Sequence, residues 1–415
     1  MKNNFINEII QRGFFHQCTD KDKLTSLISK KSIKAYIGFD CTAPSLHVGS
    51  LLQIMCLRLL QKYGHQPIVL LGGGTTLIGD PSGKDSTRKI LDEKTIDHNI
   101  QEIKKIFEKL LDFSNEEIKP IFVNNAEWLN KLYYLEFLRN IGKHFTINKM
   151  LSFDSVKLRL EREQSLSYME FNYMILQAYD FYKLNEEHNC DLQIGGSDQW
   201  GNIINGVELI RKVNQKESFG LTTPLITVAS GAKMGKTESG AIWLSENLLT
   251  PYDYWQFWRN TNDDDVKSFL KYFTEIDVDD LKKIIDDEKN INNLKIILAN
   301  EATKILHGKD KALESQKTAK ETFDENGMGQ NLPETLIEKD QIKNGIKIIE
   351  LLSESNIMSS KSEIRRAINE KGIRINDMLI ENEKKIIYLK DFKENDCIKV
   401  SYGKKRHFII RLKNI

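Results

Sequence analysis

The chain is poor in cysteine, and its five cysteines are not arranged for a metal site or a disulfide framework. They are scattered over the 415 residues without a C-x-x-C pair, which fits a reducing compartment. No apolar run reaches the roughly 20 residues of a membrane-spanning helix, and the first residues lack the apolar core of a signal peptide. We therefore expect a cytoplasmic protein without membrane association, although the few acidic residues at the start leave an organellar leader open.

The sequence also lacks the phosphate-binding loop that many nucleotide-binding proteins share. Two glycine-rich stretches approach the required pattern, at 79–84 and 231–237, but each has only three residues between its glycines. The loop requires four. Any bound nucleotide phosphate must therefore be held in another way.

Basic and acidic residues are almost equal in number, at 60 and 59. The distribution is uneven, because residues 341–415 carry 17 basic and only 10 acidic side chains. Such a basic region predicts a polyanionic partner. A solvated surface with skewed lysine usage would account for the charge equally well.

Strand and helix patterns alternate in the first half of the chain. Three buried strands are predicted, with helical patterns before and between them: strands at 33–39, 67–71 and 118–123, and helices within 1–32, 46–63 and 95–111. This alternation predicts an α/β fold with a Rossmann-type, doubly wound parallel sheet. Ligands of such sheets bind at the carboxyl ends of the strands.

The strand signals fade after about residue 250, and the length of the chain predicts more than one domain. Residues 251–323 are charged and have helical spacing, and 325–333 has the composition of a linker. We predict four parts, in chain order: a catalytic domain at 1–248, an α-helical domain at 249–324, a linker at 325–343 and a small, basic α+β module at 344–415.

Two motifs far apart in the chain suit a polyphosphate. The motif at 36–50 places His47 where a helix is expected to begin, and donors at a helix N-terminus bind anions. The motif at 233–237 supplies Lys233 and Lys236 beside glycine, which favours a mobile clamp on the leaving phosphates. Taken singly, such a histidine is more often structural, and loop lysines are usually only solvated.

A polar stripe is predicted on a helix in the middle of the chain. Tyr173, Gln177 and Asp180 recur at the spacing of one helical face, and their apolar neighbours indicate that the stripe is buried. Buried polar groups need partners, which a small polar ligand would supply, unless this is the solvated side of an amphipathic helix. Residues 192–202 predict a strand, a glycine turn and a helix, and their Gly, Asp and Gln content favours a binding role.

In this order, these stretches resemble the bacterial-type tyrosyl-tRNA synthetases, a family of class I aminoacyl-tRNA synthetases. Residues 47–50 stand at the family's HIGH signature, and 233–237 stand at its KMSKS signature. Residues 360–376 are similar to an RNA-binding module that the family shares with a ribosomal protein. The resemblance implies that tyrosine attacks ATP to give tyrosyl-adenylate and pyrophosphate, and that tyrosine is then transferred to the terminal ribose of tRNA(Tyr).

The resemblance also implies a role for individual residues. Tyrosine would be bound by Tyr36, Asp80, Tyr173, Gln177, Asp180 and Gln199. ATP would be bound by Gly38, Asp40, His47, Gly49, Ser50, Gly196, Asp198 and Lys236. Catalysis by charge stabilisation would fall to Thr42, His47, Lys84, Arg88, Lys233, Lys236 and Thr237. The phosphates of tRNA are expected at Lys361, Arg365, Arg366, Lys404, Lys405 and Arg406.

By the same resemblance, Tyr36 and Asp180 would hold the phenolic hydroxyl of the substrate. Phenylalanine would leave both groups desolvated and unpaired, at about 1–3 kcal/mol for a neutral group. The carboxylate of tyrosine is already a nucleophile, so positioning and charge stabilisation carry the catalysis. The family further implies Mg²⁺ accompanying ATP, no metal or cofactor tightly bound to the protein, and a homodimer.

Three alternatives stay open: a tryptophanyl-tRNA synthetase, a relative that only binds RNA, and a generic nucleotide-binding α/β protein. Tyr36 with Asp180 suits a phenol better than an indole, and the retained His47 opposes a loss of catalysis. Two residues depart from the family pattern, since Ser50 and Ile37 stand where relatives often carry His and Cys. Both positions are associated with the ribose, which predicts weaker ATP binding or slower activation with unchanged selection of tyrosine.

Overall fold

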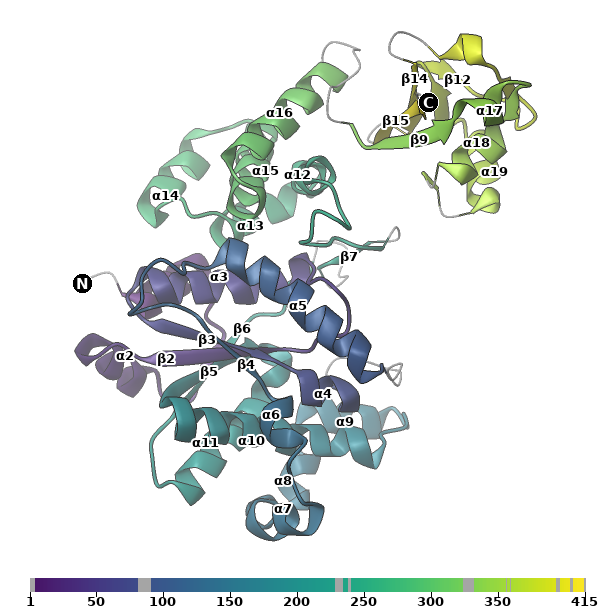
Figure 1. The fold of residues 1–415 in the computed structure, drawn as a ribbon. Coiled ribbons are helices and arrows are strands. Elements are labelled where there is room, and N and C mark those ends of the chain that lie inside the picture. The colour runs from purple at the N-terminus through teal and green to yellow at the C-terminus, as the bar shows by residue number, and fades with distance from the viewer. Residues whose placement is uncertain are drawn as a thin grey trace. The chain divides into compact units, whose positions relative to one another are not determined.

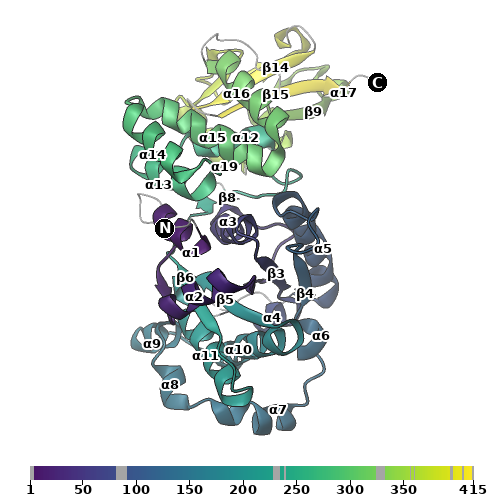
Figure 2. The same ribbon diagram turned by 90° about the vertical axis from the view of Figure 1, so that its left-hand side faces the viewer.

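The computed structural model describes most of the chain, namely residues 4–80, 91–227, 234–237, 240–323, 332–355, 357–358, 360–392, 396–403 and 406–413. Contacts divide it into two compact units. The first unit comprises Met1–Leu249 and Phe257–Leu306, and the second comprises Thr250–Gln256 and His307–Ile415. Figures 1 and 2 draw the chain from two directions.

A six-stranded sheet with the order β1-β6-β5-β2-β3-β4 forms the centre of the first unit. Its strands are β1 (Gln17–Cys18), β2 (Lys34–Phe39), β3 (Gln66–Leu71), β4 (Ile121–Asn124), β5 (Cys190–Gly196) and β6 (Phe219–Thr223). All neighbours are parallel except β1, which pairs with β6 in antiparallel fashion. The inner strands β2 and β3 are apolar and largely buried, as in sheets covered on both faces, and the predicted doubly wound parallel sheet is confirmed.

Helices cover both faces of the sheet, with α3 and α5 on one side and α10 and α11 on the other (Figure 1). Those up to the end of the sheet are α1 (Phe5–Arg12), α2 (Lys21–Lys30), α3 (Val48–Lys62), α4 (Gly73–Ile78), α5 (Glu93–Leu110), α6 (Ala126–Leu129), α7 (Tyr134–Asn140), α8 (Ile147–Leu151), α9 (Asp154–Glu161), α10 (Tyr168–His188) and α11 (Trp200–Val213). The start of α10 is fixed by a capping box, in which Ser167 and Glu170 each accept the other's backbone N–H. The predicted helical stretch 1–32 is interrupted by β1, whose two residues form a strand only through their pairing with β6.

A run of helices follows the sheet: α12 (Pro251–Arg259), α13 (Asp263–Phe273), α14 (Val278–Asp287), α15 (Ile291–His307) and α16 (Lys309–Phe323). In the first unit, α13 packs against α3 and α14 packs against α1 (Figure 2). The buried face of α13 is apolar and includes Phe269, Leu270 and Phe273. The predicted helical region at 249–324 is therefore divided between the two units. None of the helices in the described residues is long and apolar enough to cross a membrane.

The second unit contains a five-stranded sheet with the order β12-β11-β14-β15-β9. Its elements after α16 are β9 (Glu334–Glu338), α17 (Lys339–Ile342), β10 (Ile346–Lys347), α18 (Ile348–Glu354), α19 (Lys361–Asn369), β11 (Ile373–Ile375), β12 (Met378–Leu379), β13 (Ile386–Ile387), β14 (Cys397–Tyr402) and β15 (Arg406–Lys413). Aliphatic side chains of α18, α19, β11 and β14 form its core. Helices α17 to α19 and these short strands give this region the α+β composition expected of it.

The structure differs from the predicted linker at 325–343. Residues 334–338 form β9, which pairs in parallel with β15, and α17 follows directly. Ile337 and Ile342 are buried in the core of the module. So short and acidic a strand has no distinctive pattern, and it forms because β15 offers an edge to pair with.

Candidate active site

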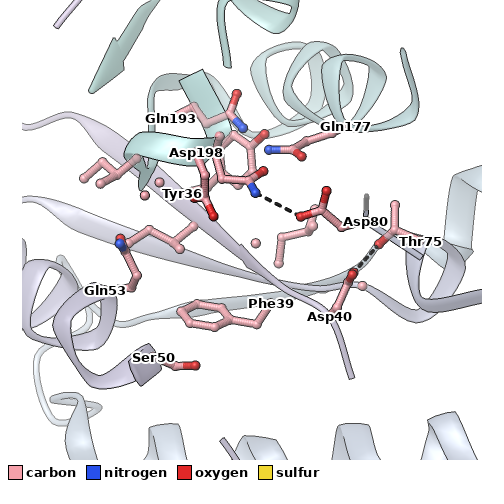
Figure 3. Close-up of a pocket in the computed structure, with 18 of the residues that line it drawn as sticks. Tyr36, Phe39, Asp40, Ser50, Gln53, Thr75, Asp80, Gln177, Gln193 and Asp198 are labelled. Carbon is pink, nitrogen blue, oxygen red and sulfur yellow. Dashed lines mark hydrogen bonds between the residues drawn. The ribbon is translucent and has the colours of Figure 1, made fainter. Parts of the chain in front are cut away.

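A cavity of about 300 Å³ lies at the carboxyl ends of β2, β3 and β5, where parallel sheets bind ligands. It is lined by many of the predicted site residues: Tyr36, Gly38, Asp40, Gly49, Ser50, Asp80, Tyr173, Gln177, Asp180, Gly196, Asp198 and Gln199. Ile37 lines it too, together with Gln53, Thr75 and Gln193, which were not predicted. Figure 3 shows Ser50 and Gln53 on one side of β2 and Gln177 and Gln193 on the other. Segments from both faces of the sheet therefore meet in one pocket.

A buried hydroxyl and a buried carboxyl group mark one part of this cavity. Tyr36 is 0% exposed and Asp180 is 1% exposed. The Tyr36 hydroxyl has no hydrogen-bond partner among the described residues. Since buried polar groups are rarely left unpaired, this hydroxyl favours a ligand that brings a polar group of its own.

Two side chains hold the carboxyl group of Asp180. Asn125 donates from Nδ2 at 2.9 Å and Trp128 donates from Nε1 at 2.8 Å. Burial raises the pKa of Asp180 to about 7; the two hydrogen bonds oppose this rise, and the nearby Asp40 adds to it. The group thus lies near the balance between its charged and neutral forms at neutral pH.

Asp40 forms a second polar centre in the cavity. It accepts a hydrogen bond from the Thr75 hydroxyl at 3.0 Å (Figure 3) and from the Tyr173 hydroxyl at 3.3 Å. Asn125 donates to Thr75 Oγ1 at 3.0 Å as well as to Asp180. A continuous hydrogen-bonded path therefore joins the carboxylates of Asp40 and Asp180.

A third group of polar side chains surrounds Asp80. Gln199 donates from Nε2 to Asp80 at 2.9 Å, and Figure 3 draws this bond at the carboxyl group of Asp80. Asn202 donates to Gln177 at 2.9 Å and to Gln199 at 3.0 Å. A carboxylate surrounded by amides suits a ligand with both an ammonium and a carboxylate group.

The two phosphate motifs meet at the start of α3. His47 is the N-cap residue, and its Nδ1 accepts the backbone N–H of Gly49 at 3.0 Å. A backbone amide can only donate, so a neutral ring carries its proton on Nε2. Gly235 lies directly beside this ring, because a Cβ atom there would come within 2.6 Å of His47 Nδ1. Residue 47 and the second motif are thus in contact.

Backbone pairing holds the second motif in place. Its Lys236 and Thr237 form β7, which pairs with β8 (Gly240–Ala241). The chain after β8 then runs beside the start of α3, where Val48 N–H donates to the carbonyl of Ile242 at 2.9 Å. Met234 and Gly235 are buried, so this part of the motif is not an exposed loop.

Some predicted residues are not at the cavity or lie outside the described residues. Thr42 is exposed, and neither it nor His47 is among the cavity-lining residues. Outside the described residues lie Lys84, Arg88, Lys233, Lys404 and Lys405. In the second unit, Lys361, Arg365 and Arg366 are exposed on α19, and Arg406 is exposed at the start of β15. The described residues contain no group of three or more His, Cys, Asp or Glu side chains that could hold a metal ion.

Several site residues were not predicted from the sequence. Asn125 directly follows β4, so the rule that ligands bind at the carboxyl ends of parallel strands could have identified it. Thr75 comes just after the predicted strand at 67–71, and the same rule applies to it. Trp128 and Asn202 carried no such signal, because only the packing of α6 and α11 brings them within hydrogen-bond distance of the cavity-lining Asp180 and Gln177.

Comparison with known proteins is consistent over both units. Residues 29–324 match the family model described as tRNA synthetases class I (W and Y), and residues 324–410 match the tyrosine–tRNA ligase SYY-like C-terminal domain. The tyrosine–tRNA ligase of Pelagibacter ubique is 63% identical over 99% of this chain and 100% of its own length. That of Rickettsia bellii is 52% identical, over 98% of this chain and 100% of its own length.

Solved structures agree with these matches. A C-terminally truncated mitochondrial tyrosyl-tRNA synthetase from Aspergillus nidulans is 29% identical, with a TM-score of 0.69 over 78% of this chain and 95% of its own. A tryptophanyl-tRNA synthetase from Plasmodium falciparum, 17% identical with a TM-score of 0.54 over 75% of this chain and 85% of its own, shares the fold alone. The chain therefore belongs to the class I tyrosyl-tRNA synthetases, the tyrosine–tRNA ligases that charge tRNA with tyrosine at the expense of ATP.

Proposed function

We propose that this ligase forms tyrosyl-adenylate in the cavity at the ends of β2, β3 and β5, with the substrate phenol directed toward Tyr36 and Asp180. The observation that carries the proposal is the buried Tyr36 hydroxyl, which has no hydrogen-bond partner among the described residues. The substrate hydroxyl can donate to Asp180 and accept from Tyr36, which satisfies all three groups. Phenylalanine can do neither, so the same pair of residues would reject it.

The remaining polar groups of the cavity suit the rest of the substrates. Asp80, Tyr173 and Gln177 would hold the α-ammonium group, and Gln199 would lie near the carboxylate. The nucleotide would extend along Gly38, Asp40, Gly49, Gly196 and Asp198. Ser50 lines the cavity from α3, and its short side chain supports the expectation of fewer ribose contacts and weaker ATP binding than with histidine.

Charge on the phosphates would be stabilised at the start of α3. Because Nδ1 accepts from Gly49, a neutral His47 ring carries its proton on Nε2, and the N-terminus of α3 favours an anion. Thr42 would stabilise the γ-phosphate together with His47. The departing pyrophosphate would be neutralised by the cations Lys84, Arg88, Lys233 and Lys236, and the hydroxyl of Thr237 would donate to it. ATP would enter with Mg²⁺ as its accompanying ion.

The tRNA would contact the helices at 249–324 and the basic module at 344–415. Support comes from the exposed cations of α19 and from Arg406, because salt-sensitive contacts to phosphates supply most nonspecific RNA affinity. Arg365 already forms a loose pair with Glu383 at 3.7 Å, which a phosphate would have to replace. Lys404 and Lys405 would complete the set. A cytoplasmic location fits the bacterial relatives.

We also propose a homodimer. Exposed large apolar side chains concentrate in the segment from α7 to the start of α10: Tyr133, Tyr134, Leu135, Leu138, Ile147, Leu151, Leu158, Leu160, Tyr168 and Met169. Tyr133 and Leu135 are more than three-quarters exposed, at 78% and 79%. An apolar surface of this kind in a monomer marks an interaction site, and a second copy of the chain is the proposed occupant.

Tyr36→Phe tests the placement of the substrate phenol. We expect the kcat/KM for tyrosine in ATP–pyrophosphate exchange to fall about tenfold, since one hydrogen bond is lost, while the value for phenylalanine does not fall. Tyr179→Phe is the matched control, because this half-buried tyrosine on α10 does not line the cavity. Equal losses for tyrosine and phenylalanine would contradict the proposed orientation.

A further inference from the structure

The C-terminal end of α13 is held by a buried arginine from α1. The guanidinium of Arg12, only 2% exposed, donates to the carbonyls of Lys271 at 3.1 Å, Thr274 at 3.0 Å and Ile276 at 2.7 Å. These carbonyls belong to the last turn of α13 and the turn that leads to α14. Helix C-termini leave such carbonyls without intrahelical partners and carry partial negative charge. Arg12 therefore caps α13 from another part of the fold.

The same arginine is paired with a buried carboxylate that reaches α3. Arg12 Nε donates to Glu8 at 2.7 Å, and Glu8 is also 2% exposed. The carboxylate of Glu8 accepts from Lys62 Nζ at 2.8 Å and from the Tyr63 hydroxyl. Lys62 is the last residue of α3 and Tyr63 is its C-cap. The Glu8–Arg12 pair thus connects the end of α3 to the end of α13.

A second ionic link runs in parallel with the first. Arg58 of α3 donates from Nε to Glu275, in the same turn after α13, at 2.8 Å. Beside these links lies a cavity of about 280 Å³. It is lined by Met55 and Leu59 of α3, by Tyr272 and Thr274, and by the charged side chains Arg12, Arg58, Lys62 and Glu275. The cavity is thus bordered by the charged groups that join α3 to this turn.

Helix α3 then leads back to the catalytic centre. Its 15 residues span about 22 Å at 1.5 Å per residue, with His47 at the beginning and the Glu8 contacts at the end. We propose that the Glu8–Arg12 pair is a positioning joint: it sets the orientation of α13–α15 against α3, so that tRNA bound by these helices presents its terminal ribose correctly to an adenylate in the proposed dimer. The inference rests on the proposed tRNA contact of the helices at 249–324.

Arg12→Met, measured in the full-length protein, separates the two reaction steps. We expect tyrosine-dependent ATP–pyrophosphate exchange without tRNA to stay within about twofold of wild type. The single-turnover rate of transfer from preformed tyrosyl-adenylate to tRNA is expected to fall about tenfold or more. Arg12→Lys keeps the charge but not the fork of donors, so its transfer rate should lie between those of wild type and Arg12→Met. Glu275→Gln should also lower the transfer rate, but by less than Arg12→Met.

Arg159→Met is the matched control. Arg159 forms a buried pair with Glu170, with side chains 5% and 7% exposed, on α9 and α10. We expect Arg159→Met to lower the thermal stability about as much as Arg12→Met does. Its exchange and transfer rates should change by the same factor. A parallel fall of exchange and transfer in Arg12→Lys and Glu275→Gln, or unchanged transfer in all joint variants, overturns the proposal. If Arg12→Met does not fold, Arg12→Lys and Glu275→Gln still decide.

Hydrogen exchange on the wild-type protein keeps the two proposals apart. Protection of 263–306 by added tRNA supports the tRNA contact of these helices. If protection is present and the joint variants transfer tyrosine normally, only the joint is wrong. If protection is absent, the tRNA contact is wrong whatever the joint variants do, and the inferred joint falls with it.

Discussion

At the scale of single residues, Asp180 stands out because three requirements meet at its carboxyl group. It must be buried to exclude water, held by Asn125 and Trp128 to keep its place, and still able to accept from a ligand. Burial, with a further contribution from the nearby Asp40, raises its pKa from the ordinary value of 3.8 to about 7, against the lowering effect of these two hydrogen bonds. A site of this kind is expected to lower stability in exchange for binding.

Asp180→Asn should reveal this cost as a pH-dependent gain in stability. Between about pH 4 and pH 7 the folded chain keeps a proton on Asp180 that the unfolded chain has lost, so stability falls as pH rises through this window. Asparagine does not titrate, so the ligand-free variant should gain stability over wild type at pH 8 relative to pH 5. Because only about two units of the shift lie above pH 5, the gain between the two pH values is at most roughly 3 kcal/mol.

Urea unfolding of both proteins at the two pH values measures this difference. Other titrating groups are common to both chains and cancel in the comparison. Tyrosine-dependent exchange should fall sharply in the variant, because the phenol loses a charged acceptor. A stability difference that is the same at pH 5 and pH 8 would contradict the raised pKa.

Sequence motifs could bring distant residues together in one predicted site. Tyr36 and Asp180 could be named because each stands in a recognisable stretch, and the structure brings both to one cavity. The path through Thr75 and Asn125 could not be named, because it depends on how far apart β3, β4 and α10 lie. Local sequence patterns do not predict the distances between the strands and helices of a fold.

At the scale of elements, the contact between the start of α3 and the hairpin β7–β8 depends on glycine. Gly235 has a φ of +105°, and a Cβ atom there would lie 2.6 Å from His47 Nδ1 and 2.9 Å from the backbone nitrogen of Gly49. Side chains are disfavoured on both grounds. The hairpin can therefore approach the N-terminus of α3 only while residue 235 lacks a side chain.

Gly235→Ala should slow tyrosine activation tenfold or more with little change in tyrosine affinity, because His47 or the hairpin must move while the phenol site does not. Gly240→Ala is the control, since its φ of +115° imposes similar strain but no atom lies within 4 Å of the new Cβ. The pre-steady-state rate of tyrosyl-adenylate formation measures the activation step. Equilibrium binding of tyrosine measures the affinity. Equal effects of the two substitutions would mean that backbone strain, not contact with His47, is responsible.

Elements with strong periodicity were predictable and short paired elements were not. The strands β2, β3 and β4 and the helices α3 and α5 begin and end within a few residues of the predicted ranges. β1 and β9 were missed because neither has an apolar pattern of its own. Each forms by pairing with a distant strand, β6 or β15, which a local pattern does not reveal.

At the scale of the whole molecule, assembly is the property that surface composition predicts best. The exposed apolar residues from Tyr133 to Met169 would cost solubility if they remained in water. We expect Leu135→Glu to convert a dimer into monomers, because a charge would be buried without a partner. Leu313→Glu is the control, since Leu313 is 52% exposed on α16, outside this segment.

Sedimentation equilibrium of the purified proteins checks the expected masses. A wild-type protein that sediments as a monomer, or a Leu135→Glu variant that stays dimeric beside the Leu313→Glu control, would refute the proposed surface. Activity of the monomeric variant in exchange and in charging would then show which step needs two subunits.

The pairing of β1 with β6 has a consequence for how the protein folds during its synthesis on the ribosome. Gln17 lies opposite Thr222 and Cys18 opposite Leu221, so the first strand waits until some 200 later residues have left the ribosome. At about 5–20 residues per second this takes roughly 10–40 s. Throughout that interval β2 has an open edge where β5 will insert, and such edges invite wrong pairing. Nascent chains of this ligase should therefore depend on chaperones at the ribosome for longer than proteins whose neighbouring strands are made one after another.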